Sequence, residues 1–378
     1  MSRAASTTLD CLKRRFDEVL PPGPHGYFSG GAADERTLSA NQAAWEAFEF
    51  LPSVMVDVAL RDTGVEILGR TAAHPLIAAP TAYQALAHAD GESAAASGCA
   101  QTQTPYTLST LATSRPGEVA RAVPTGSKWF QIYVFRDRGV TNELIAEAVD
   151  NGFEALVLTV DLPVLGRRDR DIKTSFEIGE AIDVPGVKAA GVTGRVSMQD
   201  TADLIDPSLT WADVEALAAG SDLPILVKGI VRPDDAVKAH RSGAAGVVVS
   251  NHGGRKLDGT VPTARALPDV ADAVAGMGTL IVDGGIRRGT DVVAALAMGA
   301  DAVMVGRPLL WGLAANGAAG VATVFEILLD ELDRALALIG CPNARELKGR
   351  DDLLRPLNAT LRVPLGQPSG PRRSSSAG

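Results

Sequence analysis

Short apolar runs of strand length recur eight times along the chain. Most of them are apolar at successive positions rather than at alternate ones, a pattern typical of parallel strands that are buried on both faces. The eight predicted strands cover residues 76–79, 106–109, 129–134, 155–160, 225–228, 246–250, 279–283 and 302–305.

Stretches with helical periodicity lie between these strands, because their apolar residues recur at three-to-four spacing. The clearest stretches cover residues 141–151, 234–241, 291–298 and 321–339. Gly152, Gly243 and Gly299 each follow one of the first three, at a place where a left-handed residue commonly ends a helix. Thr210, with Asp213 three residues later, predicts a capped helix start.

Eight strand–helix units in succession predict a parallel sheet, and eight is the number of strands that closes a barrel. We therefore predict an α/β protein with a (β/α)8 barrel, the TIM-barrel architecture. An open doubly wound sheet is the alternative, but no Gly-x-Gly-x-x-Gly turn follows the first strand to support it.

Three segments lie outside the repeat of strands and helices. Residues 1–75 predict an N-terminal extension of one helix, a loop and a short strand pair, which covers the floor or rim of the barrel. Residues 166–208, after the fourth strand, form a long irregular loop, which favours a mobile active-site lid over a linker. We predict one domain over 1–363 and a disordered tail over 364–378, because the tail lacks apolar content.

Composition narrows the class of partner and the compartment. The 378 residues are 46% hydrophobic, and the net charge of −9 argues against nucleic acid or an anionic membrane as a partner. No uninterrupted apolar run reaches the roughly 18 residues of a membrane span, and the first residues do not resemble a secretory signal. The three cysteines are far apart and fit no metal-ligand spacing, so we expect no metal, and buried cysteines in a reducing cytoplasm.

Residues with functional groups stand at all eight predicted strand ends, where enzymes of this fold carry their chemistry. A single histidine after a strand is more often a turn residue, but stability alone favours small turn residues and does not explain the whole set. In chain order the strand ends hold Pro80, Thr81 and Ala82; Ser109; Gln131 and Tyr133; Thr159 and Asp161, followed by Arg167 and Arg168; Lys228; Ser250, His252 and Arg255; Asp283, Gly285 and Arg287; and Gly306 and Arg307.

The last two strand ends predict a phosphate site. Gly285 and Gly306 would expose backbone N–H groups, and Arg287 and Arg307 would add guanidinium forks, in the loops that usually bind phosphate in this fold. Tight turns with solvent-facing arginines are the alternative.

Together these residues resemble the FMN-dependent 2-hydroxy acid oxidase and dehydrogenase family, which includes glycolate oxidase, lactate oxidase, mandelate dehydrogenase and hydroxymandelate oxidase. The resemblance runs from about Gly26 to about Leu357, and its most specific segment is SNHGGRKLD at 250–258. The shorter motifs that agree with it are YFSGG at 27–31, DLPVLGRR at 161–168, LVKG at 226–229, DGGIRR at 283–288 and GRP at 306–308.

The resemblance implies a catalytic role for several of these residues. His252 would be the base that takes the substrate's proton as its electrons reach the flavin, and Asp161 would orient the imidazole and stabilise its charged form. Arg168 and Arg255 would bind the substrate carboxylate, since a guanidinium fork matches a carboxylate. The hydroxyl donors beside them would be Tyr27 and Tyr133.

The resemblance also implies how FMN is bound. Lys228 would lie near flavin N1 and O2, where a positive charge stabilises the reduced ring. The other residues around the ring would be Pro80, Thr81, Ala82, Ser109, Gln131, Thr159 and Ser250. The ribityl chain and phosphate would be held by Asp283, Gly285, Arg287, Gly306 and Arg307.

Departures from the glycolate oxidases bear on the substrate and the acceptor. Leu111 stands where those enzymes carry a large aromatic residue, and the pair Ala82-Tyr83 is similar to the hydroxymandelate oxidases. This implies an (S)-2-hydroxy acid larger than glycolate, mandelate-like or long-chain, that is oxidised to the 2-oxo acid. The segment after Ile172 is acidic where membrane-bound dehydrogenases have an apolar, basic anchor, which implies O2 as the acceptor, with H2O2 as product. A homo-oligomer, tetramer or octamer, is also implied.

Three other functions stay open at this point. A 2-hydroxy acid dehydrogenase would pass its electrons to another acceptor. An FMN- or phosphate-binding barrel that does not oxidise hydroxy acids, such as an isomerase, would share the phosphate loops. Such a non-oxidising barrel would have no reason to gather two tyrosines and two arginines around one histidine. A non-catalytic flavin-binding or scaffolding protein is the third.

Overall fold

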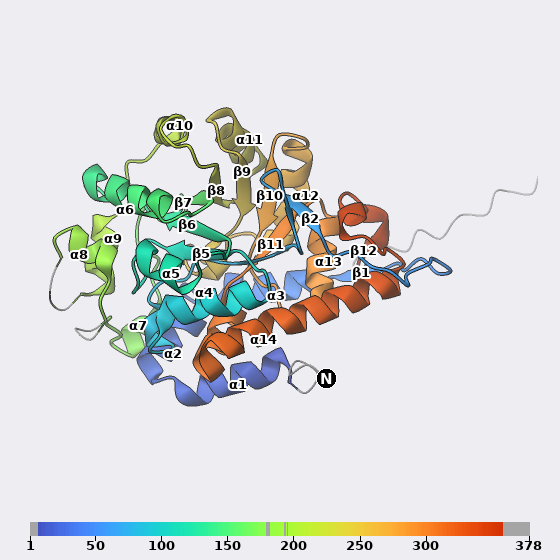
Figure 1. Ribbon diagram of the computed structural model, residues 1–378, viewed down its shortest axis with the longest axis horizontal. Helices are drawn as coiled ribbons and strands as arrows, with labels where there is room; N and C mark the ends of the chain where they lie inside the picture. Colours follow the sequence, from blue (N-terminus) through green and yellow to red (C-terminus); the bar gives the residue numbers. More distant parts are fainter. Residues whose placement is uncertain (1–6, 179–181, 193, 195, 358–378) are drawn as a thin grey trace, which may run out of the picture.

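A closed barrel of eight parallel strands forms the centre of the protein (Figure 1). The computed structural model describes residues 7–178, 182–192, 194 and 196–357. The barrel strands pair in chain order, and the last of them pairs with the first, which closes the ring. They are β4 (Leu76–Ala78), β5 (Tyr106–Ser109), β6 (Lys128–Ile132), β7 (Ala155–Thr159), β8 (Ile225–Ile230), β9 (Gly246–Val249), β10 (Thr279–Val282) and β11 (Ala302–Val305). The predicted (β/α)8 fold is confirmed.

Burial explains why the strands are apolar at successive positions. Every residue of the barrel strands is buried apart from Gly229, because the barrel interior covers one face and the surrounding helices cover the other. All eight predicted strands form, and their ends differ from the predicted ones by two residues at most.

Helices surround the barrel. They are α4 (Gly91–Gln101), α5 (Pro116–Ala122), α6 (Arg138–Asp150), α10 (Trp211–Ala219), α11 (Pro233–Arg241), α12 (Thr263–Ala273), α13 (Gly289–Ala297) and α14 (Arg307–Ile339). Gly152, Gly243 and Gly299 have φ angles of +70°, +90° and +104°, so the predicted left-handed helix ends are confirmed. The capped start is confirmed as well, because the Asp213 carboxylate accepts a hydrogen bond from the backbone N–H of Thr210 at 2.8 Å.

The long helix α14 extends the predicted 321–339 helix back to the last barrel strand, with a break in helical geometry at Asn316 and Gly317. It packs against α1, α4 and α13 along the lower side of the molecule in Figure 1. By length and composition it is the one described helix that could cross a membrane. However, 61% of its most apolar window is buried inside the protein, and core helices of soluble proteins meet the same criterion.

The described part of the N-terminal segment, from residue 7 onward, contains three helices where the sequence predicted one: α1 (Leu9–Val19), α2 (Pro22–Ser29) and α3 (Arg36–Trp45). The sequence PGPHGYFS of α2 has poor helix propensity, so packing of Tyr27 and Phe28 must stabilise this helix. The predicted strand pair is confirmed as β2 (Val65–Ile67) with β3 (Arg70–Ala72). A second pair, β1 (Phe48–Phe50) with β12 (Leu354–Pro356), was not predicted.

The segment after β7 is less irregular than predicted. It contains α7 (Asp169–Lys173), α8 (Pro185–Ala189) and α9 (Met198–Leu204). Its last residues are tied to the segment after β6, since the backbone N–H of Arg136 donates to the carbonyl oxygen of Leu204 at 2.7 Å. Whether the segment moves as a lid stays a prediction, and the predicted tail over 364–378 lies outside the described residues.

The cysteines correct one expectation. Cys99 and Cys341 are buried as predicted, but Cys11 is exposed on α1, so it is not one of the small buried side chains that the sequence suggested. Its hydrogen-bond partners are local, namely Thr8 and Arg14.

Candidate active site

A cavity opens at the C-terminal ends of the barrel strands and encloses about 1170 Å³, counting its open mouth. Every predicted site residue lines this cavity except Asp161 and Ser250. These two lie directly behind lining residues, because Asp161 is bonded to His252 and Ser250 to Lys228. The structure therefore brings together the whole predicted set, drawn from all eight strand ends and from α2.

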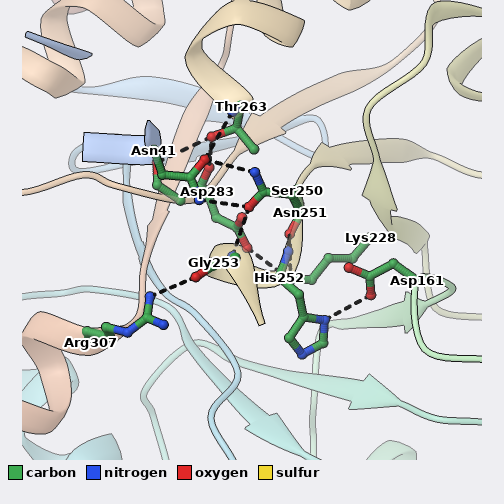
Figure 2. Close-up of polar contacts among 12 residues, drawn as sticks. Asn41, Asp161, Lys228, Ser250, Asn251, His252, Gly253, Thr263, Asp283 and Arg307 are labelled. Atoms are coloured by element: carbon green, nitrogen blue, oxygen red, sulfur yellow. Dashed lines mark hydrogen bonds and ion pairs between the residues drawn. The ribbon is translucent and has the colours of Figure 1, made fainter. Parts of the chain in front are cut away.

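His252 begins the short 3-10 helix η3 (His252–Gly254), directly after β9. Its φ of +58° is left-handed, and Gly253 and Gly254 follow with φ of +63° and +77°. Such a backbone is unfavourable for a residue with a side chain, so glycines at the next two positions limit the strain. The turn points the imidazole toward Asp161 (Figure 2).

The hydrogen bonds of His252 identify its tautomer. Nδ1 lies 2.9 Å from Oδ1 of Asp161, and an ionised carboxylate can only accept, so Nδ1 carries the proton. Nε2 is left with a lone pair, toward which the Tyr133 hydroxyl can donate from 3.3 Å. An imidazole with this arrangement can accept a proton at Nε2, while the carboxylate behind it stabilises the charge that forms.

Burial sets the charge of this pair. It lowers the pKa of His252 well below the usual range, and Asp161 only partly opposes this effect. Burial alone would raise the pKa of Asp161, but the interaction with His252 and the charge of Lys228 outweigh it and hold that pKa below its ordinary value. The pair is therefore a neutral imidazole beside a carboxylate at neutral pH.

Two guanidinium groups lie on the same side of the cavity, around the ring of Tyr27. The guanidinium carbons of Arg168 and Arg255 are 5.2 Å and 4.7 Å from the centre of this ring. Arg168 is buried and donates to the Asp171 carboxylate at 2.6 Å, whereas Arg255 donates to the carbonyl oxygens of Tyr27 and Gly30. Among the described residues, a carboxylate thus neutralises only one of the two cations, so this side of the cavity favours an anion.

Arg167 does not belong to the site. Its side chain is 74% exposed and pairs with Asp169, as expected of a neighbour of Arg168 that faces solvent.

Lys228, at the end of β8, brings a positive charge to the floor of the cavity. Its ammonium group is buried and lies 2.9 Å both from Oδ2 of Asp283 and from Oγ of Ser250. Ser250 also accepts a hydrogen bond from the backbone N–H of His252 at 3.1 Å, so one hydroxyl links the lysine to the turn that carries the histidine (Figure 2).

Gln131 offers an unused donor to the cavity. Its Oε1 accepts hydrogen bonds from Oγ of Ser109 at 3.1 Å and from the backbone N–H of Thr110 at 3.3 Å. Its Nε2 is buried and has no hydrogen-bond partner among the described residues, and the same is true of Oδ1 of Asp283. A buried donor of this kind normally has a partner, so its position favours a bound polar ligand.

The predicted phosphate end has the features that an anion requires. Gly284 and Gly285 have φ of +90° and +88°, and a Cβ at Gly285 would come within 2.3 Å of the Asn41 carbonyl oxygen. The guanidinium of Arg287 packs over the ring of Trp311 at 4.9 Å, and burial lowers its pKa to about 10. Arg307 donates to the carbonyl oxygens of Gly253, Gly30 and Phe28. These arginines are turned into the protein, so the alternative of solvent-facing arginines is wrong.

Several lining residues were missed by the sequence analysis. Lys256 follows Arg255 within the same motif, so its place next to a predicted substrate-binding residue could have indicated it. Burial lowers the pKa of Lys256 well below the usual range. Leu162 and Leu165 lie within the DLPVLGRR motif, so the motif could have indicated them too. No motif marks the residues that line the cavity from α9 and the residue after it, which are Met198, Thr201, Ala202 and Ile205.

Comparison with known proteins identifies the family to which the chain belongs. The model of the FMN-dependent dehydrogenase family matches residues 16–355. The chain belongs to this family. It is 43% identical over 334 residues to an L-lactate oxidase of Nostoc sp., covering 85% of this chain and 91% of the relative. It is 40% identical over 336 residues to human 2-hydroxyacid oxidase 1, covering 86% of this chain and 91% of the relative.

Solved structures agree with the sequence relatives. A structure of mandelate oxidase superposes with a TM-score of 0.85 at 40% identity, covering 92% of this chain and 97% of that one. A variant of mandelate oxidase with (S)-mandelic acid superposes with a TM-score of 0.83 over the same shares of the two chains. The protein is therefore an FMN-dependent oxidoreductase that acts on the CH–OH group of 2-hydroxy acids.

The residues present fit FMN. The unpartnered Nε2 of Gln131 can donate to a carbonyl oxygen of the flavin ring, and Lys228 lines the same cavity. Gly284 and Gly285 line the cavity after β10, and Arg287 and Arg307 supply two positive charges for the phosphate. Within the described ranges, no group of three or more His, Cys, Asp and Glu side chains lies close enough together to hold a metal ion.

Proposed function

We propose that this enzyme oxidises (S)-2-hydroxy acids larger than glycolate to 2-oxo acids, with O2 as the electron acceptor and H2O2 as product. The observation that carries the proposal is the unprotonated Nε2 of His252, in the cavity that the guanidinium groups of Arg168 and Arg255 also line. The relatives named lactate and 2-hydroxyacid oxidase support O2 as acceptor, and the likeness to mandelate oxidase supports a large substrate.

In this proposal the residues around the cavity divide into two groups. When bound, FMN accepts the two electrons that the substrate loses at C2. The residues that would hold it are Pro80, Thr81, Ala82, Ser109, Gln131, Thr159, Lys228, Ser250, Asp283, Gly285, Arg287, Gly306 and Arg307. Lys228 would supply a positive charge to the bound flavin, which favours the negative charge that reduction brings.

The second group handles the substrate. Arg168 and Arg255 bind the carboxylate, which fixes C2 and its hydroxyl group relative to the histidine. Nε2 of His252 then accepts the proton that the substrate loses, and Asp161 stabilises the imidazolium through the hydrogen bond to Nδ1. The hydroxyl group of Tyr133, 3.3 Å from Nε2, is placed to donate to the substrate oxygen.

The simplest test uses the colour of the flavin. The purified protein should be yellow, and a 2-hydroxy acid added without oxygen should bleach it. Readmitting O2 should restore the colour with one H2O2 per turnover. A bleached enzyme that recovers only with another acceptor would indicate a dehydrogenase, and a yellow enzyme that no hydroxy acid bleaches would indicate a non-oxidising barrel.

The preference for large substrates rests on the wall of the cavity. Leu111 and Ala82 line it where a large aromatic residue would narrow it, and α9 contributes Met198 and Thr201 rather than an aromatic ring. The one aromatic residue of 166–208, Phe176, stacks on Tyr27 at 5.1 Å and does not line the cavity. Apolar surface is therefore left for a substrate side chain to cover.

We expect mandelate and long aliphatic (S)-2-hydroxy acids to have a higher kcat/KM than glycolate. Covering apolar surface contributes about 25 cal/mol per Å², so a phenyl group should gain a few kcal/mol at most. Leu111→Trp should refill the space and move the preference toward small acids. Steady-state oxygen uptake with a panel of acids measures both effects. A wild-type ranking with glycolate above mandelate would contradict the interpretation of Leu111.

The pKa of His252 predicts how activity depends on pH. The histidine acts as a base only when neutral, and its lowered pKa keeps it neutral through pH 6.5, the usual histidine value. We therefore expect kcat/KM to stay level from pH 8 down through 6.5 and to fall only in more acid buffer. A pH series of kcat/KM measures this. A decrease of kcat/KM in acid with a midpoint at or above pH 6.5 would show that burial does not control the pKa of His252.

A further inference from the structure

Two buried asparagine side chains, Asn41 and Asn251, face each other behind the active site. Nδ2 of Asn41 donates to Oδ1 of Asn251 at 2.9 Å, and Nδ2 of Asn251 donates to Oδ1 of Asn41 at 2.8 Å. Their relative exposures are 1% and 6%. Asn41 belongs to α3, and Asn251 is the residue before His252, so this reciprocal pair joins the N-terminal segment to the catalytic turn (Figure 2).

Asn251 also holds the turn that follows it. Its Oδ1 accepts a hydrogen bond from the backbone N–H of Gly254 at 3.2 Å, and its Nδ2 donates to the carbonyl oxygen of Val261 at 3.0 Å. One side chain thus spans both ends of the loop that carries His252 and Arg255. Asn41 supplies the remaining donor and acceptor for this side chain.

The loop needs such support because its backbone is unfavourable. His252, Gly253 and Gly254 are all left-handed, and a residue with a side chain keeps this conformation only where its surroundings impose it. In Figure 2 the His252 ring points toward Asp161, away from the asparagine pair, so neither asparagine touches the imidazole. Asn41 can affect the imidazole only by holding its backbone.

The same helix is fixed to the loop after β10. Oδ1 of Asn41 accepts a hydrogen bond from the backbone N–H of Thr263 at 3.4 Å, and the Thr263 hydroxyl donates to the carbonyl oxygen of Asp283. The indole N–H of Trp45 donates to the carbonyl oxygen of Gly284 at 2.8 Å. α3 is therefore hydrogen-bonded both to the loop of the proposed base and to the loop of the proposed phosphate site.

We propose that Asn41 is a positioning residue, which holds the His252 turn in register with the phosphate loop through its reciprocal pair with Asn251. The proposal rests on the proposed function of His252 as the base. It adds that the N-terminal helix α3, which lies outside the barrel, fixes where Nε2 stands relative to the bound substrate. Displacements of about 1 Å at a reacting group can lower a rate about 100-fold.

Asn41→Ala tests this with Thr37→Val as its matched control. Thr37 is buried on the same helix, and its hydroxyl accepts from the backbone N–H of Gly259 at 2.8 Å, in the same loop but beyond the histidine turn. We expect Asn41→Ala to lower kcat about 10- to 100-fold, with KM changed less than about threefold and FMN content unchanged. Thr37→Val should lower the Tm comparably and keep kcat within about twofold. Asn41→Leu removes the same hydrogen bonds without leaving a cavity, should Asn41→Ala not fold.

A second measurement does not depend on turnover. The proton on Nδ1 of His252, held by Asp161, should give a downfield proton NMR signal, identified by its loss in His252→Gln. Asn41→Ala should shift or broaden this signal, and Thr37→Val should leave it in place. Wild-type kcat and an unchanged signal in a folded Asn41→Ala enzyme would overturn the proposal, as would equal losses of kcat in the two variants. A wild-type enzyme that no hydroxy acid bleaches would instead refute the proposed function. The NMR signal of the His252 Nδ1 proton would still show whether the Asn41–Asn251 pair positions the histidine.

Discussion

His252→Gln should bind FMN as the wild type does and yet turn over 2-hydroxy acids about 10⁴-fold more slowly, at the upper end of what a general base contributes. The amide cannot accept the substrate proton, and it breaks the hydrogen bond between Nδ1 and Asp161. The rate of flavin bleaching in anaerobic stopped-flow mixing measures the loss directly, before any step that involves O2.

His240→Gln is the control for this variant. His240 lies on α11, outside the cavity, and its ring is bonded to the carbonyl oxygen of Ala244. It should keep the wild-type bleaching rate. If His252→Gln bleached at a rate close to that of the wild type, His252 would not be the base.

Arg255→Lys should lower kcat/KM about 100-fold although it keeps the charge. An ammonium group cannot form the paired hydrogen bonds of a guanidinium with a carboxylate, and each hydrogen bond to a charged group contributes about 1.5–3 kcal/mol. In this protein the substitution also removes the donor that binds the carbonyl oxygens of Tyr27 and Gly30, so the wall next to the substrate loosens as well.

Arg168→Met should mainly raise KM, but it also leaves the buried Asp171 carboxylate without its partner. The double variant Arg168→Met/Asp171→Asn removes both charges and separates loss of substrate binding from the effect of an unpaired carboxylate. Arg167→Met is the control, because that neighbouring side chain is exposed and should not matter. Steady-state rates with a free acid and its methyl ester complete the test. Equal oxidation of the two would rule out a carboxylate clamp.

The sequence alone determined the barrel and most of the site. Strands buried on both faces must be apolar at successive positions, so β4 to β11 could be recognised without any partner in view. The functional residues could be recognised because barrel strands end at one face, so contiguous motifs such as 250–258 deliver their side chains to a single cavity.

Only the tertiary structure decided the parts whose stability comes from distant residues. α2 forms in spite of its prolines and glycines because Tyr27 and Phe28 are buried, and β1 exists because it pairs with β12 at the other end of the chain. Ser197 and Asp200 cap the start of α9, but no local signal places this helix at the cavity. The Asn41–Asn251 pair is the clearest case, because its members are 210 residues apart. The sequence around an asparagine in a helix does not indicate which distant residue it will bind. Local patterns encode which face of an element is buried, whereas the choice of partner across that face depends on packing of the whole chain.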